Sequence, residues 1–288
     1  MITIRALEAA RGPFRLHVPE LAIGRGLTLL TGRNGSGKST LLNILSTAWL
    51  PDRGGIDYDG LSLAESRPIL RSRIGFLPSG LELHEDMTAE KFLRYMGELK
   101  GIYDQEPART LLEEMDLTSL RRRRIRELSQ GQRQKLALAQ ALLGQPAYLF
   151  LDEPLTFLDS GERRQVVSWL GRYALRRHVV VSSHELNEWE PAESILWLNE
   201  GGVLFHGPAE EWGRDLPLSV WTGTVNESEW ADLSQELVMG WRQVPGGREV
   251  RVMAPEPPAS GFVPADPTRE DAYFIRRYVL RESRTKGE

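Results

Sequence analysis

One segment of the sequence constrains what the chain can fold into, and it reads Gly32-Arg33-Asn34-Gly35-Ser36-Gly37-Lys38-Ser39-Thr40. It fits the phosphate-binding pattern G-x-x-x-x-G-K-[ST] at every required position. The apolar run Leu27–Leu30 precedes it, and apolar residues at helical spacing follow it from Leu41 until Leu50-Pro51. The segment therefore predicts a strand, a phosphate loop and a helix, which is the order that the pattern requires.

The chemistry of this loop follows from its residue types. Its three glycines let the backbone curl so that N–H groups face an anion, and the helix that begins near Lys38 adds the positive end of its dipole. Lys38 is then placed to reach the β- and γ-phosphates, and the Ser39 hydroxyl a Mg²⁺ ion. A glycine-rich turn without a ligand would not require Lys followed by Ser. We therefore expect a site for a nucleoside triphosphate.

Composition narrows the class of protein. The chain has 288 residues, of which 41% are hydrophobic and 26% charged, as in ordinary globular proteins with one large or two modest domains. The net charge of −4 gives no basic field, so we expect no nucleic-acid partner. No apolar run approaches the roughly 20 residues that span a bilayer, and Met1–Arg5 resembles no secretory signal. The absence of cysteine suits a reducing cytoplasm, where we expect the protein.

The first half of the chain predicts a hairpin, a sheet and a helical insertion. Residues 1–7 alternate apolar and polar, and a second alternating run contains Phe14, whose ring is a candidate to stack on adenine or to face the core. Clusters of turn-forming residues at 52–55 and 57–60 predict turns around a short hairpin, and residues 73–77 are predicted to form a strand. Apolar residues at helical spacing then predict a helical subdomain over about residues 81–145.

Polar residues follow two further predicted strands. Ser129 begins a helix of good helix formers as its N-cap, and the apolar strand Tyr148–Leu151 then leads to Asp152-Glu153 before Pro154. A third buried strand, Val179–Val181, leads to His184. Ligands bind at the carboxyl edge of a parallel sheet. This position therefore favours a role in binding or catalysis for the Asp-Glu pair and for His184, rather than that of ordinary surface side chains.

Gly207-Pro208 marks a boundary, after which the pattern predicts a small α+β appendage over residues 209–288. Strands are expected at 219–225 and 248–252, a helix from Asn226, a Pro-rich loop at 255–264 and a helix from Asp266. Its Trp221, Trp230 and Trp241 are candidates for a ligand cage or, as we expect, for the packing of a small core.

Together these motifs resemble the ATP-binding subunit of an ABC transporter over about residues 1–210. Leu128-Ser129-Gln130-Gly131-Gln132 is similar to that family's LSGGQ signature. The resemblance implies an α/β fold: a P-loop NTPase (RecA-like) core with an N-terminal antiparallel β subdomain in residues 1–208, followed by the accessory domain 209–288. It implies ATP and Mg²⁺ as ligands and a second subunit, most simply in a homodimer, whose Ser129, Gly131 and Gln132 contact the nucleotide.

The resemblance also assigns single residues. It implies that Asp152 supports Mg²⁺ through water, that Glu153 polarises the attacking water, that Asp159 belongs to the D-loop and that His184 is the switch histidine. Two positions depart from the family pattern. Ser79 stands where the family has a glutamine that touches Mg²⁺, and the adenine-stacking aromatic is replaced near Arg11, so that the Arg11 guanidinium or Phe14 would have to stack instead.

These features lead us to expect a cytoplasmic ATPase that works at the inner face of the cell membrane with a separate transmembrane permease. The segment Asp266–Asp271 resembles the Pro-Thr-x-Glu-Asp end of drug, antibiotic or lipid exporter subunits, so export is the expected direction. One alternative is a soluble ABC ATPase on ribosomes or DNA, although the interval between Lys38 and Ser129 is short for a coiled-coil arm. The other is a weakly hydrolysing regulator, which Ser79 favours and Glu153 and His184 oppose.

Overall fold

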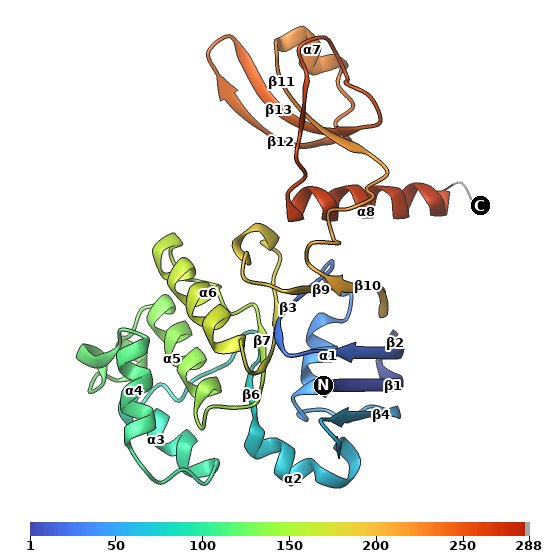
Figure 1. The fold of residues 1–288 in the computed structure, drawn as a ribbon. Coiled ribbons are helices and arrows are strands. Elements are labelled where there is room, and N and C mark those ends of the chain that lie inside the picture. The colour runs from blue at the N-terminus through green and yellow to red at the C-terminus, as the bar shows by residue number, and fades with distance from the viewer. Residues whose placement is uncertain (286–288) are drawn as a thin grey trace. The chain divides into compact units, whose positions relative to one another are not determined.

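The structure is a computed structural model that describes residues 1–285, and it divides into two compact units. The first unit comprises Met1–His184 and Glu188–Pro208, and the second comprises Glu185–Asn187 and the chain from Ala209 onward. Figure 1 shows both along the chain by colour. Within the described residues, no helix is both long and apolar enough to cross a membrane.

The first unit contains an antiparallel sheet with the strand order β2-β1-β4-β5. Its strands are β1 (Ile2–Arg11), β2 (Phe14–Ile23), β4 (Arg53–Tyr58) and β5 (Leu61–Ser62). The predicted N-terminal hairpin is confirmed, since β1 pairs with β2 from Ile2 opposite Ile23 to Arg11 opposite Phe14. Alternate side chains such as Ile2 and Ile4 are buried in one hydrophobic cluster together with Leu41 and Leu45.

The turn predicted at residues 52–55 is wrong, because Gly54 and Gly55 lie inside β4. Gly54 has φ +81°, and a Cβ atom on it would lie 2.2 Å from the carbonyl oxygen of Ala6 on the paired strand. The register between β1 and β4 shifts between Arg5 and Glu8, so this is a β-bulge. Glycine is therefore required here by a close approach of two strands rather than by a turn.

A second, mostly parallel sheet forms the centre of the first unit, with the strand order β10-β9-β3-β8-β7-β6. Its strands are β3 (Gly26–Thr31), β6 (Ile74–Leu77), β7 (Tyr148–Asp152), β8 (His178–Ser182), β9 (Ser194–Asn199) and the antiparallel β10 (Gly202–Pro208). Every residue of β3, β7 and β8 is buried. This is why these strands read as continuous apolar runs in the sequence.

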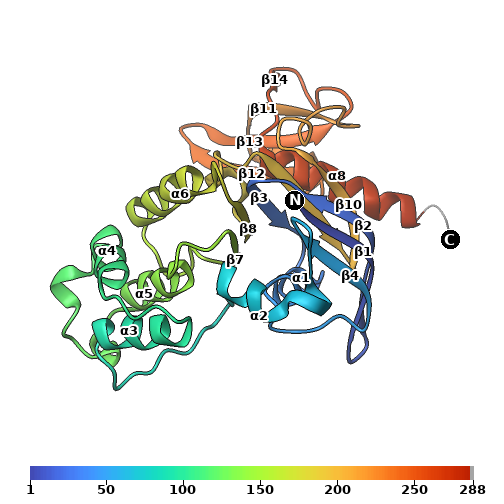
Figure 2. The ribbon, with the colours of Figure 1, turned by 60° about the horizontal axis from the view of Figure 1, so that its bottom comes forward.

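Four helices pack against strands of this sheet, namely α1 (Lys38–Leu45), α2 (Leu63–Arg73), α5 (Gln130–Leu142) and α6 (Ser160–Ala174). Two more, α3 (Ala89–Leu99) and α4 (Glu106–Glu114), pack on each other and on α5. Short 3₁₀ turns lie at Thr118–Leu120, Ile125–Glu127 and Leu186–Glu188. In Figures 1 and 2, α3, α4 and α5 lie together, on the other side of β7 from α1. The sequence predicted that α1 continues to Leu50, but it ends at Leu45, because Thr47 adopts a left-handed backbone with φ 66°.

The second unit is a small α+β fold. An antiparallel sheet has the strand order β12-β13-β11-β14, and its strands are β11 (Ser219–Val225), β12 (Val238–Val244), β13 (Gly247–Ala254) and β14 (Val263–Ala265). Two helices, α7 (Glu227–Asp232) and α8 (Arg269–Thr285), complete it. One face of the sheet packs on Ile275 of α8 and the other on Phe262. Strand β14 enters the stretch that the sequence predicted as a loop, because it pairs with β11.

Aromatic side chains of the second unit pack rather than form an open cage. The rings of Trp230 and Trp241 lie 5.7 Å apart, and the Arg248 guanidinium lies over both, at 4.9 and 5.6 Å from their centroids. Trp221 donates from Nε1 to the Ala254 carbonyl at 3.1 Å. Trp221 and Trp230 pack against the buried cluster of Val225, Val250, Val252 and Phe262, which confirms the expected packing role for these two residues. Trp241 is 56% exposed and lies outside that cluster.

Candidate nucleotide-binding site

The carboxyl ends of three neighbouring strands converge in the central sheet. In the parallel register, Ser182 of β8 lies opposite both Leu30 of β3 and Asp152 of β7. The phosphate loop follows β3, Glu153 follows Asp152, and His184 follows β8. The sheet thus brings the predicted loop, the acid pair and the histidine to one edge, as the sequence predicted for a parallel sheet.

The loop closes tightly at its last glycine. Gly37 is the N-cap residue of α1 and has φ 107°, a left-handed conformation that favours glycine. A Cβ atom at this position would lie 2.8 Å from Cζ of Phe14. The Phe14 ring therefore packs against the loop backbone and fixes where the loop turns into the helix.

Two polar side chains are buried in this loop. Lys38 is 7% exposed, and its Nζ donates to the carbonyl oxygens of Gly32 at 2.8 Å and Arg33 at 3.3 Å. Burial lowers the pKa of Lys38, while the nearby Glu153 and Asp152 carboxylates oppose that shift. Among the described residues, the buried Ser36 Oγ has no hydrogen-bond partner. A buried hydroxyl and ammonium in a glycine-rich loop fit a phosphate, whose oxygens accept from both.

The rest of the loop is open to solvent. Arg33, Asn34 and Gly35 are exposed, as is Ser39 in the first turn of α1, and Thr40 is partly exposed. In the part of the chain that the structure describes, no three His, Cys, Asp or Glu side chains come together as a metal site. The available donors, the Ser39 hydroxyl and the Asp152 carboxylate, fit Mg²⁺, which proteins usually bind through one or two side chains together with phosphate oxygens.

The acid pair at the end of β7 is held in a hydrogen-bonded network. Asp152 is 3% exposed, and its Oδ1 accepts from Ser182 Oγ at 2.5 Å. Glu153 has φ 51°, unusual for a residue with a side chain, and its N–H donates to the same Ser182 Oγ at 3.0 Å. Its Oε1 lies 3.4 Å from Nε2 of His184. The two predicted catalytic side chains after β7 and β8 are therefore adjacent.

The signature segment begins helix α5. Gln132 N–H donates to Ser129 Oγ at 3.2 Å, and Ser129 N–H donates to Gln132 Oε1 at 3.0 Å, which completes a capping box. A Cβ atom on Gly131 would lie 3.0 Å from the Phe157 carbonyl oxygen. This segment therefore contacts the loop after β7, and Figures 1 and 2 show its helix on the other side of β7 from α1. Helix α5, which this segment begins, thus lies apart from α1, the helix that follows the phosphate loop.

Other predicted residues have different surroundings. Asp159 is the N-cap of α6, where its Oδ1 accepts from the N–H groups of Gly161 and Glu162, both at 2.8 Å. Ser79 lines a cavity of about 830 Å³ together with Asp152 and Glu153. Ser79 therefore lies near the acid pair, and its predicted contact with Mg²⁺ stays a prediction.

The Arg11 guanidinium, one of the two candidates to stack on adenine, already contacts other groups of this chain. Its guanidinium lies 4.7 Å from the centroid of the Trp49 ring and donates to the Ala10 carbonyl at 2.6 Å. To stack on adenine, Arg11 would have to leave Trp49, and Phe14 would have to present the part of its ring that is not packed on Gly37.

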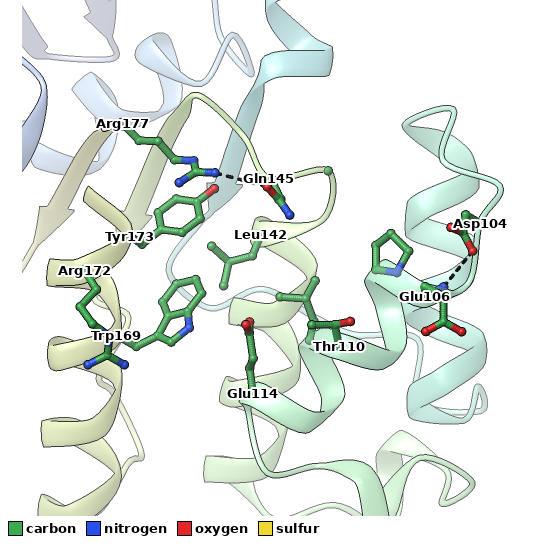
Figure 3. A pocket seen from close by; sticks show the side chains of 13 residues that line it. Asp104, Glu106, Thr110, Glu114, Leu142, Gln145, Trp169, Arg172, Tyr173 and Arg177 are labelled. Atoms are coloured by element: carbon green, nitrogen blue, oxygen red, sulfur yellow. Dashed lines mark hydrogen bonds between the residues drawn. The ribbon is translucent and has the colours of Figure 1, made fainter. Parts of the chain in front are cut away.

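A second cavity, of about 520 Å³, lies between α4 and α6. Figure 3 shows Trp169, Tyr173 and Leu142 pointing into it, and the rings of Trp169 and Tyr173 are stacked at 5.0 Å. Of its lining residues, Arg177 directly precedes β8 and Gln145 lies shortly before β7, so the cavity lies at the amino ends of these strands. It contains none of the predicted site residues and lies at the edge opposite the phosphate loop.

Two residues that touch the acid pair were not predicted. Ser182 contacts Asp152 and the peptide of Glu153. Gln134 of α5 donates from Nε2 to the carbonyl of Glu153 at 3.5 Å and to that of Pro154 at 3.0 Å. A parallel pairing of the predicted strands would have revealed Ser182, since it lies level with Asp152. Gln134 had no such signal, because it lies among ordinary helix formers.

A buried lysine in a glycine-rich loop, facing an acid pair across the carboxyl edge of a parallel sheet, defines the class of P-loop nucleotide-binding proteins. Comparison with known proteins narrows the class. A profile of the family "ABC transporter" matches residues 20–156. The daunorubicin resistance ATP-binding protein DrrA3 of Streptomyces coeruleorubidus is 34% identical over 218 residues, which cover 73% of this chain and 69% of that protein.

A molybdenum import protein is also similar. The ATP-binding protein ModC of Paramagnetospirillum magneticum is 32% identical over 226 residues, covering 75% of this chain but only 62% of its own length. The solved dimeric structure of the ATP-binding cassette MJ0796 in a post-hydrolysis state with ADP and Pi matches with a TM-score of 0.65 at 25% identity, covering 72% of this chain and 98% of that one. The chain belongs to the ATP-binding proteins of the ABC transporter family, as the motifs predicted.

Proposed function

We propose that this protein hydrolyses ATP and couples binding and hydrolysis to transport by a separate membrane permease, in the export direction. The observation that carries the proposal is the position of Glu153, beside the buried Asp152 and 3.4 Å from His184, on the sheet edge that bears the phosphate loop. DrrA3 is a resistance protein and ModC an import protein, so the export direction rests on the resistance relative and the segment Asp266–Asp271.

The chain's own residues divide the work. Lys38, Ser36 and the N–H groups at the start of α1 bind the phosphates. Ser39 and Asp152 would hold Mg²⁺, Asp152 through water, and the bound ion would neutralise charge on the phosphates. Glu153 orients or deprotonates the attacking water, and His184 holds the Glu153 carboxylate and the site around it.

The test is hydrolysis by the Glu153→Gln variant. The amide cannot accept the proton, so we expect kcat to fall about 100- to 10,000-fold, the usual range for loss of a general base. ATP binding should persist, because the phosphate loop is unchanged. Glu113→Gln, at an exposed glutamate of α4, is the matched control and should hydrolyse like the wild type. Wild-type turnover by Glu153→Gln would contradict the proposed mechanism.

We further propose that the site is shared by two chains in a homodimer. This is supported by the position of α5, which begins with the capped signature segment and lies on the other side of β7 from α1, and by the dimer of the matching cassette. Ser129, Gly131, Gln132 and Asp159 would then contact nucleotide on the partner. A heterodimer with a related subunit is the alternative.

Sedimentation of Glu153→Gln with and without Mg-ATP tests the dimer, since bound nucleotide adds contacts between subunits. Lys38→Ala and Ser129→Arg chains, each inactive alone, should regain hydrolysis when mixed, because one composite site is then intact. Monomers at saturating Mg-ATP, together with normal hydrolysis by Ser129→Arg alone, would exclude the shared site. Normal hydrolysis that needs an unlike partner would support the heterodimer.

A weakly hydrolysing regulator is the second candidate. Ser79 favours it because serine is too short to do both jobs of the family's glutamine, which touches Mg²⁺ and reports the nucleotide state to the membrane subunit. Turnover separates the two candidates. We expect rates of about 1 s⁻¹ or more for a transport ATPase, in the usual range of enzymes. Recovery of a membrane protein with the tagged chain from solubilised membranes tests the permease and the location at the inner face of the membrane.

A further inference from the structure

Ser182 is the residue on which the acid pair converges. Its side chain is completely buried, at the last position of β8. Its Oγ contacts Asp152 Oδ1 at 2.5 Å and Glu153 N at 3.0 Å. One hydroxyl group thus links the carboxylate of Asp152 to the backbone of Glu153.

The direction of these hydrogen bonds is fixed by chemistry. A peptide N–H only donates, so Ser182 Oγ accepts from Glu153 and its single proton goes to Asp152. A hydroxyl that donates to a carboxylate makes a short, charge-assisted bond, in agreement with the distance of 2.5 Å. The serine therefore occupies one oxygen of Asp152 and leaves the other for ligands.

The backbone of Glu153 needs such support. A left-handed φ of 51° is unfavourable for a residue with a Cβ atom and persists where neighbouring groups over-determine it. The N–H side of the residue is tied to Ser182, and its carbonyl accepts from Thr156 Oγ1 at 3.0 Å and from Gln134 Nε2 at 3.5 Å. Both peptide groups are thereby fixed, and this directs the carboxylate toward His184.

We propose that Ser182 is a positioning residue for hydrolysis. Its single hydroxyl fixes the Asp152 carboxylate and the backbone of Glu153 relative to each other. The proposal rests on the proposed role of Glu153. Ser182 affects hydrolysis through Glu153 and touches neither nucleotide nor water itself.

The experiment compares Ser182→Ala with the wild type in the full chain. We expect kcat to fall about 10- to 100-fold, because a displacement of about 1 Å at the reacting groups costs on the order of 100-fold. Affinity for ATP without Mg²⁺ depends on the phosphate loop and should stay within about twofold, within the error expected for an independent site. Ser194→Ala, which removes another hydroxyl bond of the sheet, at 2.8 Å from Thr28 at the amino end of β9, is the matched control with unchanged kcat.

The decisive readout is the double variant. If Ser182 acts through Glu153, Ser182→Ala in the Glu153→Gln background lowers the residual rate no further. An equal fall in both backgrounds, or wild-type kcat in Ser182→Ala, would overturn the proposal. Ser182→Cys keeps the volume with a weak donor and should lie between serine and alanine; it carries the test if the alanine variant does not fold, and wild-type kcat would then overturn it. Loss of activity in Glu153→Gln but not in the Ser182 variants would leave the proposed function standing.

Discussion

Lys100 should make the stability of the first unit depend on pH in an unusual range. It caps the carboxyl end of α3, and its Nζ donates to the Leu143 carbonyl at 3.2 Å, at the end of α5. Burial lowers the pKa of Lys100 from 10.5 to about 8. The ammonium group is thus poorly solvated. Its hydrogen bond to a carbonyl at the end of α5 offsets only part of this cost.

The magnitude follows from the shift. Each pKa unit corresponds to about 1.4 kcal/mol, so the charged form of Lys100 costs the folded state about 3 kcal/mol at pH 7. Lys100→Met removes this cost and also one hydrogen bond, worth about 1 kcal/mol. We expect a net gain of about 2 kcal/mol in the free energy of unfolding at pH 7.

The sign reverses with pH. The folded pKa is the lower one, so between about pH 8 and 10.5 the unfolded chain binds more protons and wild-type stability rises with pH. Once the lysine is neutral in both the folded and the unfolded state, the free energies of unfolding of the wild type and Lys100→Met differ only by the hydrogen bond. The advantage of Lys100→Met should then vanish and become a deficit of about 1 kcal/mol.

Urea unfolding of both proteins at pH 7 and at pH 10 measures the difference, and NMR titration of the lysine side chains locates the pKa directly. Lys91→Met, at an exposed lysine of the same helix, is the control and should show no such dependence. A difference that is equal at both pH values, or a Lys100 signal that titrates near 10.5, would refute the reasoning.

Three further outcomes are expected. Lys38→Ala should weaken ATP binding about 10- to 100-fold in calorimetry, because charge-assisted hydrogen bonds contribute about 1.5 to 3 kcal/mol; unchanged affinity rejects its role. Gly37→Ala should lower the free energy of unfolding by about 1 to 3 kcal/mol, the usual cost of a strained φ, and Phe14→Leu should not fully restore it, since the φ of 107° remains; full restoration would mean that only the ring contact matters. A fragment of residues 1–208 should keep ATP affinity within about threefold, because independent units contribute additively; a soluble, folded fragment that binds no ATP would show that residues 209–288 help to build the site.

Elements whose burial shows in the local sequence pattern could be predicted from the sequence. The strands at Leu27–Leu30, Tyr148–Leu151 and Val179–Val181 read as apolar runs because both faces are covered, and Ser129 read as an N-cap because a capping box is local. The convergence of Asp152-Glu153 and the phosphate loop followed from the general rule for parallel sheets. Local pattern and topology thus sufficed for the centre of the candidate site.

Other features depend on distant partners. Gly54 reads as a turn residue, yet it faces the Ala6 carbonyl of a strand far away in the sequence. Helix α2 contains Pro68 and a non-helical residue at Ser66, so its pattern is interrupted although its ends pack on the core. Ser182 acquires its contacts only when β7 and β8 lie side by side. In each case a tertiary contact, which no local propensity contains, decides the structure.

The place of β3 in the central sheet has a consequence for folding during translation. Its two neighbours are β8 and β9, and Gly26 pairs with His178, about 150 residues later in the chain. Translation usually proceeds at about 5 to 20 residues per second, so synthesis of the chain between Gly26 and His178 takes about 8 to 30 s. During this time β3, the strand before the phosphate loop, has no partner strand in the central sheet. ATP therefore has no formed site to bind on the nascent chain. Until His178 emerges, the apolar strand β3 depends on collapse or on a chaperone to keep it from aggregating.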